Sequence, residues 1–261
     1  MTIHPTAIIS DQADIAPDVE IGAYSVIDGD VAIGTGNVID SHTRIGSRFG
    51  TVTIGERNYI QSGATLGGPP QDWSYENEKT RLEIGDGNRI GEYASVNLGS
   101  QKGGGVTRLG NGTFIMAYSH VGHDSQIGND VVLTNLAHLA GHVSVGHGAV
   151  VGGMTAITQF ARIGQWAFVA AGALVNKDIL PFCIAEGQWA TPRATNKIGL
   201  RRAGFSSSEV QEIDKAIRIL KRRSTTLEEA TTRIREDCEA NDRIEELLSF
   251  IASSERGIAR A

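Results

Sequence analysis

An aliphatic residue recurs at every sixth position through most of the first two thirds of the chain. The repeat runs without a break from Leu109 to Val175 and, in the N-terminal part, from Ile3 to Ile45. A period of six fits neither the 3.6-residue turn of a helix nor the simple alternation of a strand. It is typical of a parallel β-helix, in which short strands meet at corners and successive coils stack on one another.

Three such positions make one coil of 18 residues, so that residue i lies beside residue i+18, about 4.8 Å away along the axis. We expect a β-helix over residues 1–180, with loops leaving the coils at 67–83 and 97–108, where the aliphatic phase is broken. Residues 181–205 are predicted to form an irregular connector. Residues 206–261 are predicted to form a helical C-terminal domain that covers the open end of the solenoid.

The predicted helical domain begins with a capping box, Ser206 followed three residues later by Glu209. A second box, Thr225 with Glu228, predicts the start of a second helix, and a third helix is expected over about 240–253.

Composition excludes several classes of function. The formal net charge of −6 argues against a general nucleic-acid-binding protein. The cysteines, Cys183 and Cys238, lie far apart in unlike segments, which favours a reducing compartment over a disulfide framework. No apolar stretch reaches transmembrane length, and the N-terminus shows no secretory pattern, so we expect a cytoplasmic protein without an integral membrane segment.

Five of the seven histidines cluster in the middle of the chain, and the 18-residue period predicts which of them meet. His120 should stack on His138, and Asp124 should stack on His142, with His123 next to Asp124 in sequence. An imidazole held in one tautomer by a carboxylate is suited to general-base catalysis. The alternatives are a polar outer face or subunit contacts. A zinc site is less favoured, because the spacings lack a tight ligand pair such as HxH.

Several motifs resemble those of one family, the acyl-[acyl-carrier-protein]:UDP-N-acetylglucosamine O-acyltransferases. The resemblance covers nearly the whole chain. The matching stretches are Gln71-Asp72, Thr80-Arg81-x-Glu83-Ile84-Gly85-Asp86, Gly103-Gly104-Gly105, His120-x-x-His123-Asp124, residues 139–145 (LAGHVSV), residues 152–156 (GGMTA), Gln159-Phe160, Ala190-Thr191-Pro192 and residues 199–206 (GLRRAGFS).

The resemblance implies an all-β solenoid, a left-handed parallel β-helix of hexapeptide repeats with a C-terminal α-helical domain. It also implies a homotrimer with active sites in the clefts between subunits. The implied reaction is transfer of a 3-hydroxyacyl chain from acyl carrier protein to the 3-position of UDP-N-acetylglucosamine, the first step of lipid A biosynthesis. No cofactor and no metal are implied.

The resemblance assigns roles to individual residues. His123 would be the general base, Asp124 would orient it, and the Gly141 N–H would stabilise the oxyanion. The implied substrate-binding residues are His120 and His142 lining the site, Gln159, Asn196 and Arg202 holding the nucleotide, and Gln71 and Asp72 touching the sugar or the acyl chain.

The chain also departs from the family pattern, mainly where the acceptor would bind. Neutral residues replace basic or acidic ones at Ser74, Asn97, Leu98, Thr158, Ile198 and Ala203, while Arg193 and Lys197 are additional basic residues nearby. Two alternatives therefore remain beside the family reaction: the same chemistry on a UDP 3-amino sugar, or a non-catalytic protein that binds a nucleotide sugar or acyl carrier. Ala171, at the position that sets acyl length in the family, leaves the chain length open.

Basic residues concentrate around the first predicted helix of the C-terminal domain. They are Lys215, Arg218, Lys221, Arg222 and Arg223. With helical spacing, residues 215, 218 and 222 share one face. We expect a docking patch for the acidic acyl carrier protein; the alternative is a solvated helix face.

Overall fold

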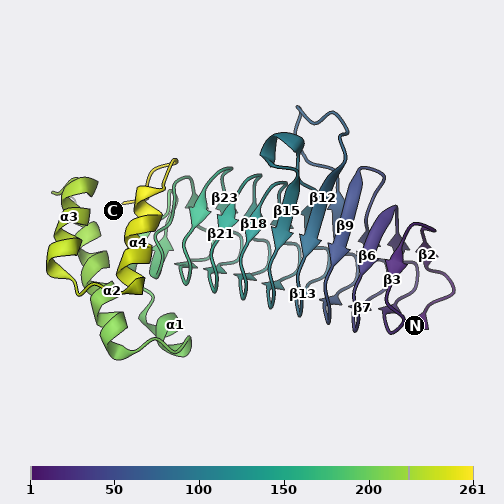
Figure 1. The fold of residues 1–261 in the computed structure, drawn as a ribbon, viewed down its shortest axis with the longest axis horizontal. Coiled ribbons are helices and arrows are strands. Elements are labelled where there is room, and N and C mark those ends of the chain that lie inside the picture. Colours follow the sequence, from purple (N-terminus) through teal and green to yellow (C-terminus); the bar gives the residue numbers. More distant parts are fainter. Residues whose placement is uncertain (1, 223, 261) are drawn as a thin grey trace.

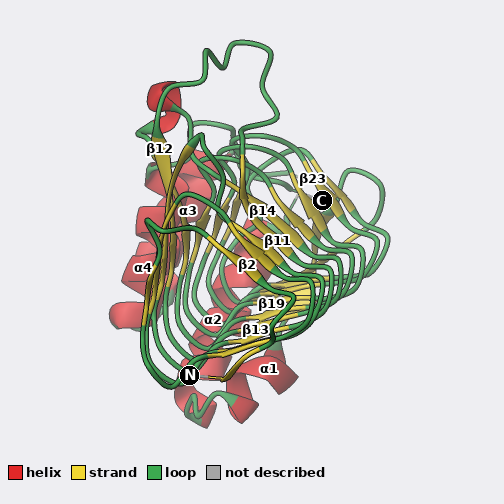
Figure 2. Cartoon of the chain, turned by 90° about the vertical axis from the view of Figure 1, so that its right-hand side faces the viewer, coloured by secondary structure: helices red, strands yellow, loops and turns green. Residues whose placement is uncertain are grey.

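The computed structural model describes residues 2–222 and 224–260, and it is a solenoid closed at one end by helices (Figure 1). Viewed from the N-terminal end, the coils superimpose into one three-sided outline (Figure 2). Each side is a sheet to which every coil contributes one short strand. All strand pairs are parallel except the pair that the last two strands form.

The three sheets are named A, B and C. Sheet A contains β1 (Thr2–Ile3), β4 (Glu20–Ile21), β7 (Val38–Ile39), β10 (Tyr59–Ile60), β13 (Arg89–Ile90), β16 (Phe114–Ile115), β19 (Val132–Leu133), β22 (Val150–Val151), β25 (Phe168–Val169), β27 (Cys183–Glu186) and β28 (Thr191–Thr195). Sheet B contains β2 (Ile8–Ile9), β5 (Val26–Ile27), β8 (Arg44–Ile45), β11 (Thr65–Gly68), β14 (Ser95–Asn97), β17 (His120–Val121), β20 (His138–Leu139), β23 (Ala156–Ile157) and β26 (Leu174–Val175). Sheet C contains β3 (Asp14–Ile15), β6 (Asp30–Ile33), β9 (Gly50–Ile54), β12 (Thr80–Ile84), β15 (Val106–Leu109), β18 (Gln126–Ile127), β21 (Ser144–Val145) and β24 (Arg162–Ile163).

The six-residue ladder is the core of the solenoid. In the two-residue strands the second residue is the ladder aliphatic and points inward, while the first points outward; Val121 and Leu133, for example, are fully buried. The 18-residue register is confirmed, since His120 pairs with His138 and Val121 with Leu139 across adjacent coils.

Two excursions leave the coils, both at the turns between sheets B and C. The first spans residues 69–79, and the second spans residues 98–105 and contains the short helix η1 (Gln101–Gly103). Both are shorter than the loops expected at 67–83 and 97–108, because β12 and β15 begin before the aliphatic ladder resumes. Both project from the upper edge of the solenoid in Figure 1.

The expectation of an irregular connector over 181–205 is wrong. Strands β27 and β28 form an antiparallel pair that extends sheet A, and helix α1 (Lys197–Arg202) follows, with Asn196 as its N-cap. The sequence pattern missed these strands because they do not follow the six-residue period.

Three further helices cover the end of the solenoid: α2 (Ser207–Leu220), α3 (Leu227–Asp237) and α4 (Asp242–Ala252). The capping box of Ser206 and Glu209 is confirmed. The second box is shifted by one residue from the prediction, with Thr226 and Glu229 as its members. None of the helices in residues 2–222 and 224–260 combines the length and apolar character that crossing a membrane requires.

Candidate active site

The turns that join sheet B to sheet C form an edge that we call the BC corner, and the clustered histidines gather there. His123 and Asp124 occupy the turn after β17, and Gly141 and His142 occupy the turn after β20, one coil further on. The backbone is left-handed at Asp124 (φ 62°) and His142 (φ 61°). This repeated conformation places equivalent side chains of successive coils above one another, so the predicted stacking of Asp124 and His142 is confirmed.

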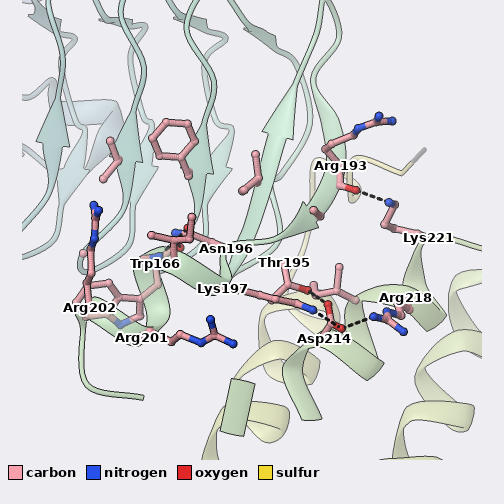
Figure 3. Close-up of a pocket in the computed structure, with 18 residues that line it drawn as sticks. Trp166, Arg193, Thr195, Asn196, Lys197, Arg201, Arg202, Asp214, Arg218 and Lys221 are labelled. Atoms are coloured by element: carbon pink, nitrogen blue, oxygen red, sulfur yellow. Dashed lines mark hydrogen bonds and ion pairs between the residues drawn. The ribbon is translucent and has the colours of Figure 1, made fainter. Parts of the chain in front are cut away.

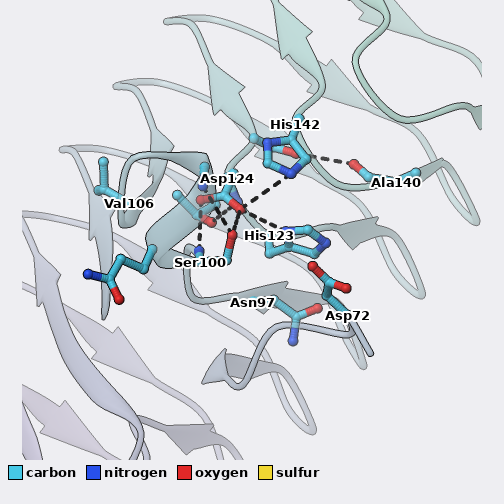
Figure 4. Close-up of polar contacts among 12 residues, drawn as sticks. Asp72, Asn97, Ser100, Val106, His123, Asp124, Ala140 and His142 are labelled. Carbon is cyan, nitrogen blue, oxygen red and sulfur yellow. Dashed lines mark hydrogen bonds and ion pairs between the residues drawn. The ribbon is translucent and has the colours of Figure 1, made fainter. Parts of the chain in front are cut away.

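Asp124 is the centre of a buried hydrogen-bond network (Figure 4). Its side chain is fully buried, and Oδ2 accepts hydrogen bonds from His123 Nδ1 at 2.7 Å and Ser100 Oγ at 2.7 Å. Oδ1 accepts from the Ser100 backbone N–H at 2.7 Å. Because the carboxylate only accepts, it holds the proton of His123 on Nδ1 and leaves Nε2 free to accept a proton.

The His123 ring lies directly against Gly141. A Cβ atom at Gly141 would stand 2.5 Å from His123 Nε2, so any larger residue at this position would displace the His123 ring. Among the described residues, the Gly141 N–H has no hydrogen-bond acceptor. His123 Nε2, which can accept a proton, and the Gly141 N–H, a donor without a partner, therefore face the same small space.

His142 completes this group from the next coil. Its Nε2 is 3.7 Å from Asp124 Oδ2, and its ring meets the His123 ring edge-on, with centroids 5.0 Å apart. On its other side it stacks on Phe160, with centroids 4.4 Å apart. These contacts fix the orientation of both imidazoles.

The local environment shifts three pKa values in ways that suit this arrangement. Burial by itself would raise the pKa of Asp124, but hydrogen bonds from His123 and Ser100 outweigh it and lower the pKa, which keeps the carboxylate charged. Burial lowers the pKa of His142 and of His120, which favours neutral rings. His120 is also held by Ser95, whose Oγ lies 2.8 Å from its Nδ1.

The first excursion brings Asp72 near the histidines. Hydrogen bonds from the Ser74 backbone and hydroxyl lower the pKa of Asp72, and the proximity of His123 lowers it further. In the view of Figure 4, Asp72 and Asn97 are both seen below His123. Gln71 is exposed on the same loop. Asn97 Nδ2 donates to the Pro69 carbonyl, which ties the start of the loop to β14.

A second concave region lies at a different edge, where sheet C turns into sheet A. This groove, of about 1040 Å³, runs between the outer face of sheet A and helices α1 and α2 (Figure 3). Asn196 and Arg202 line it, together with the exposed Ile198. The Asn196 amide is also structural, because it donates to the Trp166 carbonyl and caps α1.

Two additional basic residues in the groove are paired. Lys197 Nζ lies 2.8 Å from Asp214 Oδ2, which Arg218 Nη2 also approaches at 2.7 Å. Arg193 Nε lies 3.4 Å from Glu186. Asp214 therefore neutralises part of the charge that Lys197 was expected to add.

The implied nucleotide-binding residues are not brought together within one chain. Gln159 lies exposed at the BC corner, whereas Asn196 and Arg202 lie in the groove at the other edge. The histidine cluster at the BC corner and the basic groove, which we call the two half-sites, are thus separate regions of the chain.

The predicted docking residues lie on two sides of α2. Arg218 and Lys221 line the groove, and Lys221 Nζ donates to the Arg193 carbonyl. Lys215 reaches across to the Asp237 carbonyl. Helix α2 ends at Leu220, so the expectation that Arg222 shares a helical face with Lys215 and Arg218 is wrong. Arg223 lies outside the described residues.

Two contacts at the BC corner could not be predicted from the sequence. Ser100 holds Asp124, but it lies in the second excursion, where the 18-residue count does not apply. Arg256, after α4, lies 3.5 Å from Thr158 Oγ1. No periodic signal links the C-terminal segment to a coil 98 residues earlier.

His123, Asp124 and His142 offer ligand atoms that all lie within 4.8 Å of one another, a spacing compatible with a metal ion. The hydrogen bond between His123 Nδ1 and Asp124 uses two of those ligand atoms. A histidine hydrogen-bonded in this way to a buried carboxylate is also an arrangement that general-base catalysis can use.

Family models match two parts of the chain. Residues 178–259 match "Udp N-acetylglucosamine O-acyltransferase; Domain 2", and residues 107–141 match "Bacterial transferase hexapeptide (six repeats)". A curated relative from Thiobacillus denitrificans, an acyl-[acyl-carrier-protein]–UDP-N-acetylglucosamine O-acyltransferase, is 43% identical over 259 residues, covering 99% of each chain. A relative of the same name from Syntrophobacter fumaroxidans is 42% identical over the full length of both chains.

Solved structures agree with this result. The UDP-N-acetylglucosamine acyltransferase of Francisella novicida superimposes with a TM-score of 0.95 at 35% identity, covering 100% of this chain and 94% of that one. The enzyme of the same name from Campylobacter jejuni gives a TM-score of 0.92 at 39% identity and full coverage of both chains. The fold is therefore the expected left-handed parallel β-helix with a C-terminal helical part.

Proposed function

The chain belongs to the acyl-[acyl-carrier-protein]–UDP-N-acetylglucosamine O-acyltransferase family, and on that premise we propose that His123 is the general base of this reaction. The enzyme transfers a 3-hydroxyacyl chain from acyl carrier protein to the 3-hydroxyl of UDP-N-acetylglucosamine, the first step of lipid A biosynthesis. The hydrogen bond between His123 Nδ1 and the buried Asp124 carries this assignment, since it presents Nε2 as the proton acceptor.

In the proposed reaction, His123 Nε2 accepts the proton of the sugar 3-hydroxyl as its oxygen attacks the thioester carbonyl. The Gly141 N–H donates to the oxyanion that develops on that carbonyl. Collapse expels the thiolate of the carrier's prosthetic arm, which takes the proton back from His123. Asp124 stabilises the imidazolium while His123 carries the proton. Donor and acceptor supply every reacting atom, so the proposal uses neither a metal nor a cofactor.

We further propose that the two half-sites meet between subunits of a homotrimer. The outward residues of sheet A are largely apolar, as in Phe114, Val132, Val150 and Phe168, whereas those of sheet C, such as Arg108 and Arg162, are polar or charged.

The turns between sheets A and B carry a row of exposed apolar side chains. These are Tyr24, Tyr93, Tyr118, Leu136 and Met154, between 41% and 67% exposed. Rows of exposed large apolar residues mark contact surfaces.

The apolar outer face of sheet A and the apolar row at the turns between sheets A and B support a threefold axis along those turns. The polar outer face of sheet C then faces solvent. Sheet B of one subunit then faces sheet A of the next, a head-to-tail contact that closes into a ring. Further from the axis, the BC corner with His123 faces the groove lined by Asn196 and Arg202 of the neighbouring copy. The same assembly joins Gln159 to the rest of the implied nucleotide site.

A His123→Ala variant tests the proposed role of the base. We expect turnover to fall by about 10³-fold or more, while calorimetric binding of UDP-N-acetylglucosamine and the trimeric mass stay unchanged. His4→Ala, at an exposed histidine in the first coil and far from the BC-corner cluster, is the matched control. Turnover of the His123 variant within tenfold of the wild type would refute the assignment; turnover that is absent in the wild type itself would instead support a non-catalytic binding protein.

Acylation of a UDP 3-amino sugar is the second candidate, and Asn97 favours it. The Asn97 Oδ1 atom is buried and has no hydrogen-bond partner among the described residues. A 3-hydroxyl has a single hydrogen, which goes to His123, whereas a 3-amino group keeps a second N–H for an acceptor such as Asn97. The ratio of kcat/KM for the two acceptors decides between them, and Asn97→Ala should lower the value for the amine more than the value for the hydroxyl.

A further inference from the structure

The BC corner continues beyond the histidines toward the C-terminal end of the solenoid, and it becomes basic there. The turn position that His123 occupies is taken by Gly141, Gln159 and Lys177 in the three coils that follow, as the strand register shows. Lys177 is exposed. Three coils at about 4.8 Å place it about 14 Å from His123 along the axis.

Arg256 joins Lys177 from the C-terminal segment. Its guanidinium donates to the Asn176 carbonyl at 3.3 Å and lies 3.5 Å from Thr158 Oγ1. Neither cation forms an ion pair with a carboxylate of residues 2–222 or 224–260. In Figure 1 the yellow segment that follows α4 turns at the same upper edge from which the two excursions rise.

A buried carboxylate fixes this segment in place. Asp178 is fully buried, accepts hydrogen bonds from Ser254 Oγ at 2.7 Å and from the Arg162 N–H at 2.9 Å, and pairs through its backbone with residues 257 and 259. These contacts hold Arg256 over the turn that contains Lys177.

In the opposite direction, toward the N-terminus, the two excursions occupy the BC corner. The first excursion brings Asp72 beside His123, and Glu78 of the same loop accepts a hydrogen bond from the Gln101 N–H in the second excursion. A long thioester that reacts between His123 and Gly141 therefore extends toward Lys177 and Arg256.

Building on the proposed function, we propose that Lys177 and Arg256 bind the phosphate of the 4′-phosphopantetheine arm of the acyl carrier protein. Between its phosphorus and its sulfur this arm has about thirteen covalent bonds, a reach of roughly 15 Å at the extension of a polypeptide backbone. That length matches the axial separation of Lys177 from His123. The two cations thus hold the donor at a distance that delivers its thioester to the base.

A comparison of two soluble donors tests this inference. Acyl-phosphopantetheine carries the phosphate and acyl-pantetheine lacks it, while both present the same thioester. We expect the wild-type enzyme to prefer the phosphorylated donor in kcat/KM by about tenfold or more, since about 1.4 kcal/mol corresponds to a factor of ten. In Lys177→Gln/Arg256→Gln this preference should disappear, with kcat/KM for acyl-pantetheine and KM for UDP-N-acetylglucosamine unchanged.

Two further variants separate charge from structure. Arg256→Lys should restore part of the preference, and Arg233→Gln, on the outer helix α3, should leave it intact. Three results would each overturn the inference. They are an equal loss of kcat/KM for both donors, a rise in KM for the nucleotide sugar alone, and a wild type that does not discriminate between the donors. Absence of wild-type transfer from acyl carrier protein would instead contradict the proposed function.

Discussion

Replacing Asp124 with asparagine keeps the shape of the side chain but removes its negative charge and one of its two acceptor oxygens. Oδ1 accepts from the Ser100 N–H, and Oδ2 accepts from His123 Nδ1, each at 2.7 Å. An asparagine has one oxygen for these two positions. If that oxygen stays with the Ser100 N–H, the amide N–H₂ faces His123 Nδ1, which must then accept. The proton of His123 moves to Nε2, and the base is lost.

The magnitude follows from the contacts. The bond from His123 to a fully buried carboxylate is charge-assisted and contributes about 1.5–3 kcal/mol. Its loss corresponds to about 10- to 150-fold in kcat, and the wrong tautomer adds to this. We expect kcat of Asp124→Asn to fall by at least about 100-fold, because base orientation and imidazolium stabilisation are both lost.

Steady-state transfer from acyl carrier protein measures this prediction. KM for UDP-N-acetylglucosamine should change by less than about twofold, because the fully buried Asp124 side chain leaves no surface for a substrate to contact. Ser100→Ala is the control: it removes one hydroxyl donor to Asp124 but keeps the bond to His123, so kcat should fall by only about tenfold or less. A kcat of Asp124→Asn within threefold of the wild type would refute the role given to this pair.

Three further predictions test other parts of the account. Gly141→Ala should lower kcat by about tenfold or more, because its Cβ would stand 2.5 Å from His123 Nε2; unchanged kcat would exclude the close packing. Lys221→Glu with Arg222→Glu should raise KM for acyl carrier protein about tenfold at low salt but leave the KM of acyl-pantetheine unchanged; equal effects on both would argue against docking. Burial raises the pKa of Glu246 to about 7. Its folded pKa exceeds its unfolded pKa, so stability falls as pH rises between about 4.5 and 7. Glu246→Gln should be about 1 kcal/mol more stable than the wild type at pH 8 in urea, after allowance for solvent screening, with the difference vanishing toward pH 4.

The repeat made the fold predictable because a solenoid is quasi-one-dimensional. Each coil contacts only its neighbours, so counting 18 residues was enough to place Asp124 under His142. The same count failed wherever the chain left the ladder. It could not place Ser100, which lies in an excursion, or the strands β27 and β28, which follow no six-residue period.

The candidate site was harder to predict than the fold for two physical reasons. The contact of Arg256 with Thr158 depends on how the C-terminal segment packs, and such long-range packing leaves no local pattern. The groove with Asn196 and Arg202 lies at a different edge from His123, so the residues implied by the resemblance do not lie together within a single chain.

Mixed trimers test the central claim, that each active site is completed by two chains. His123→Ala and Arg202→Glu each inactivate one half-site, and subunits of the two variants can be unfolded together and reassembled at equal ratio. If the base of one subunit acts with the groove of the next, about a quarter of the sites combine an intact base with an intact groove, and about a quarter of wild-type activity returns. If each chain forms its own site, every site is defective, and the mixture stays as inactive as the separate variants.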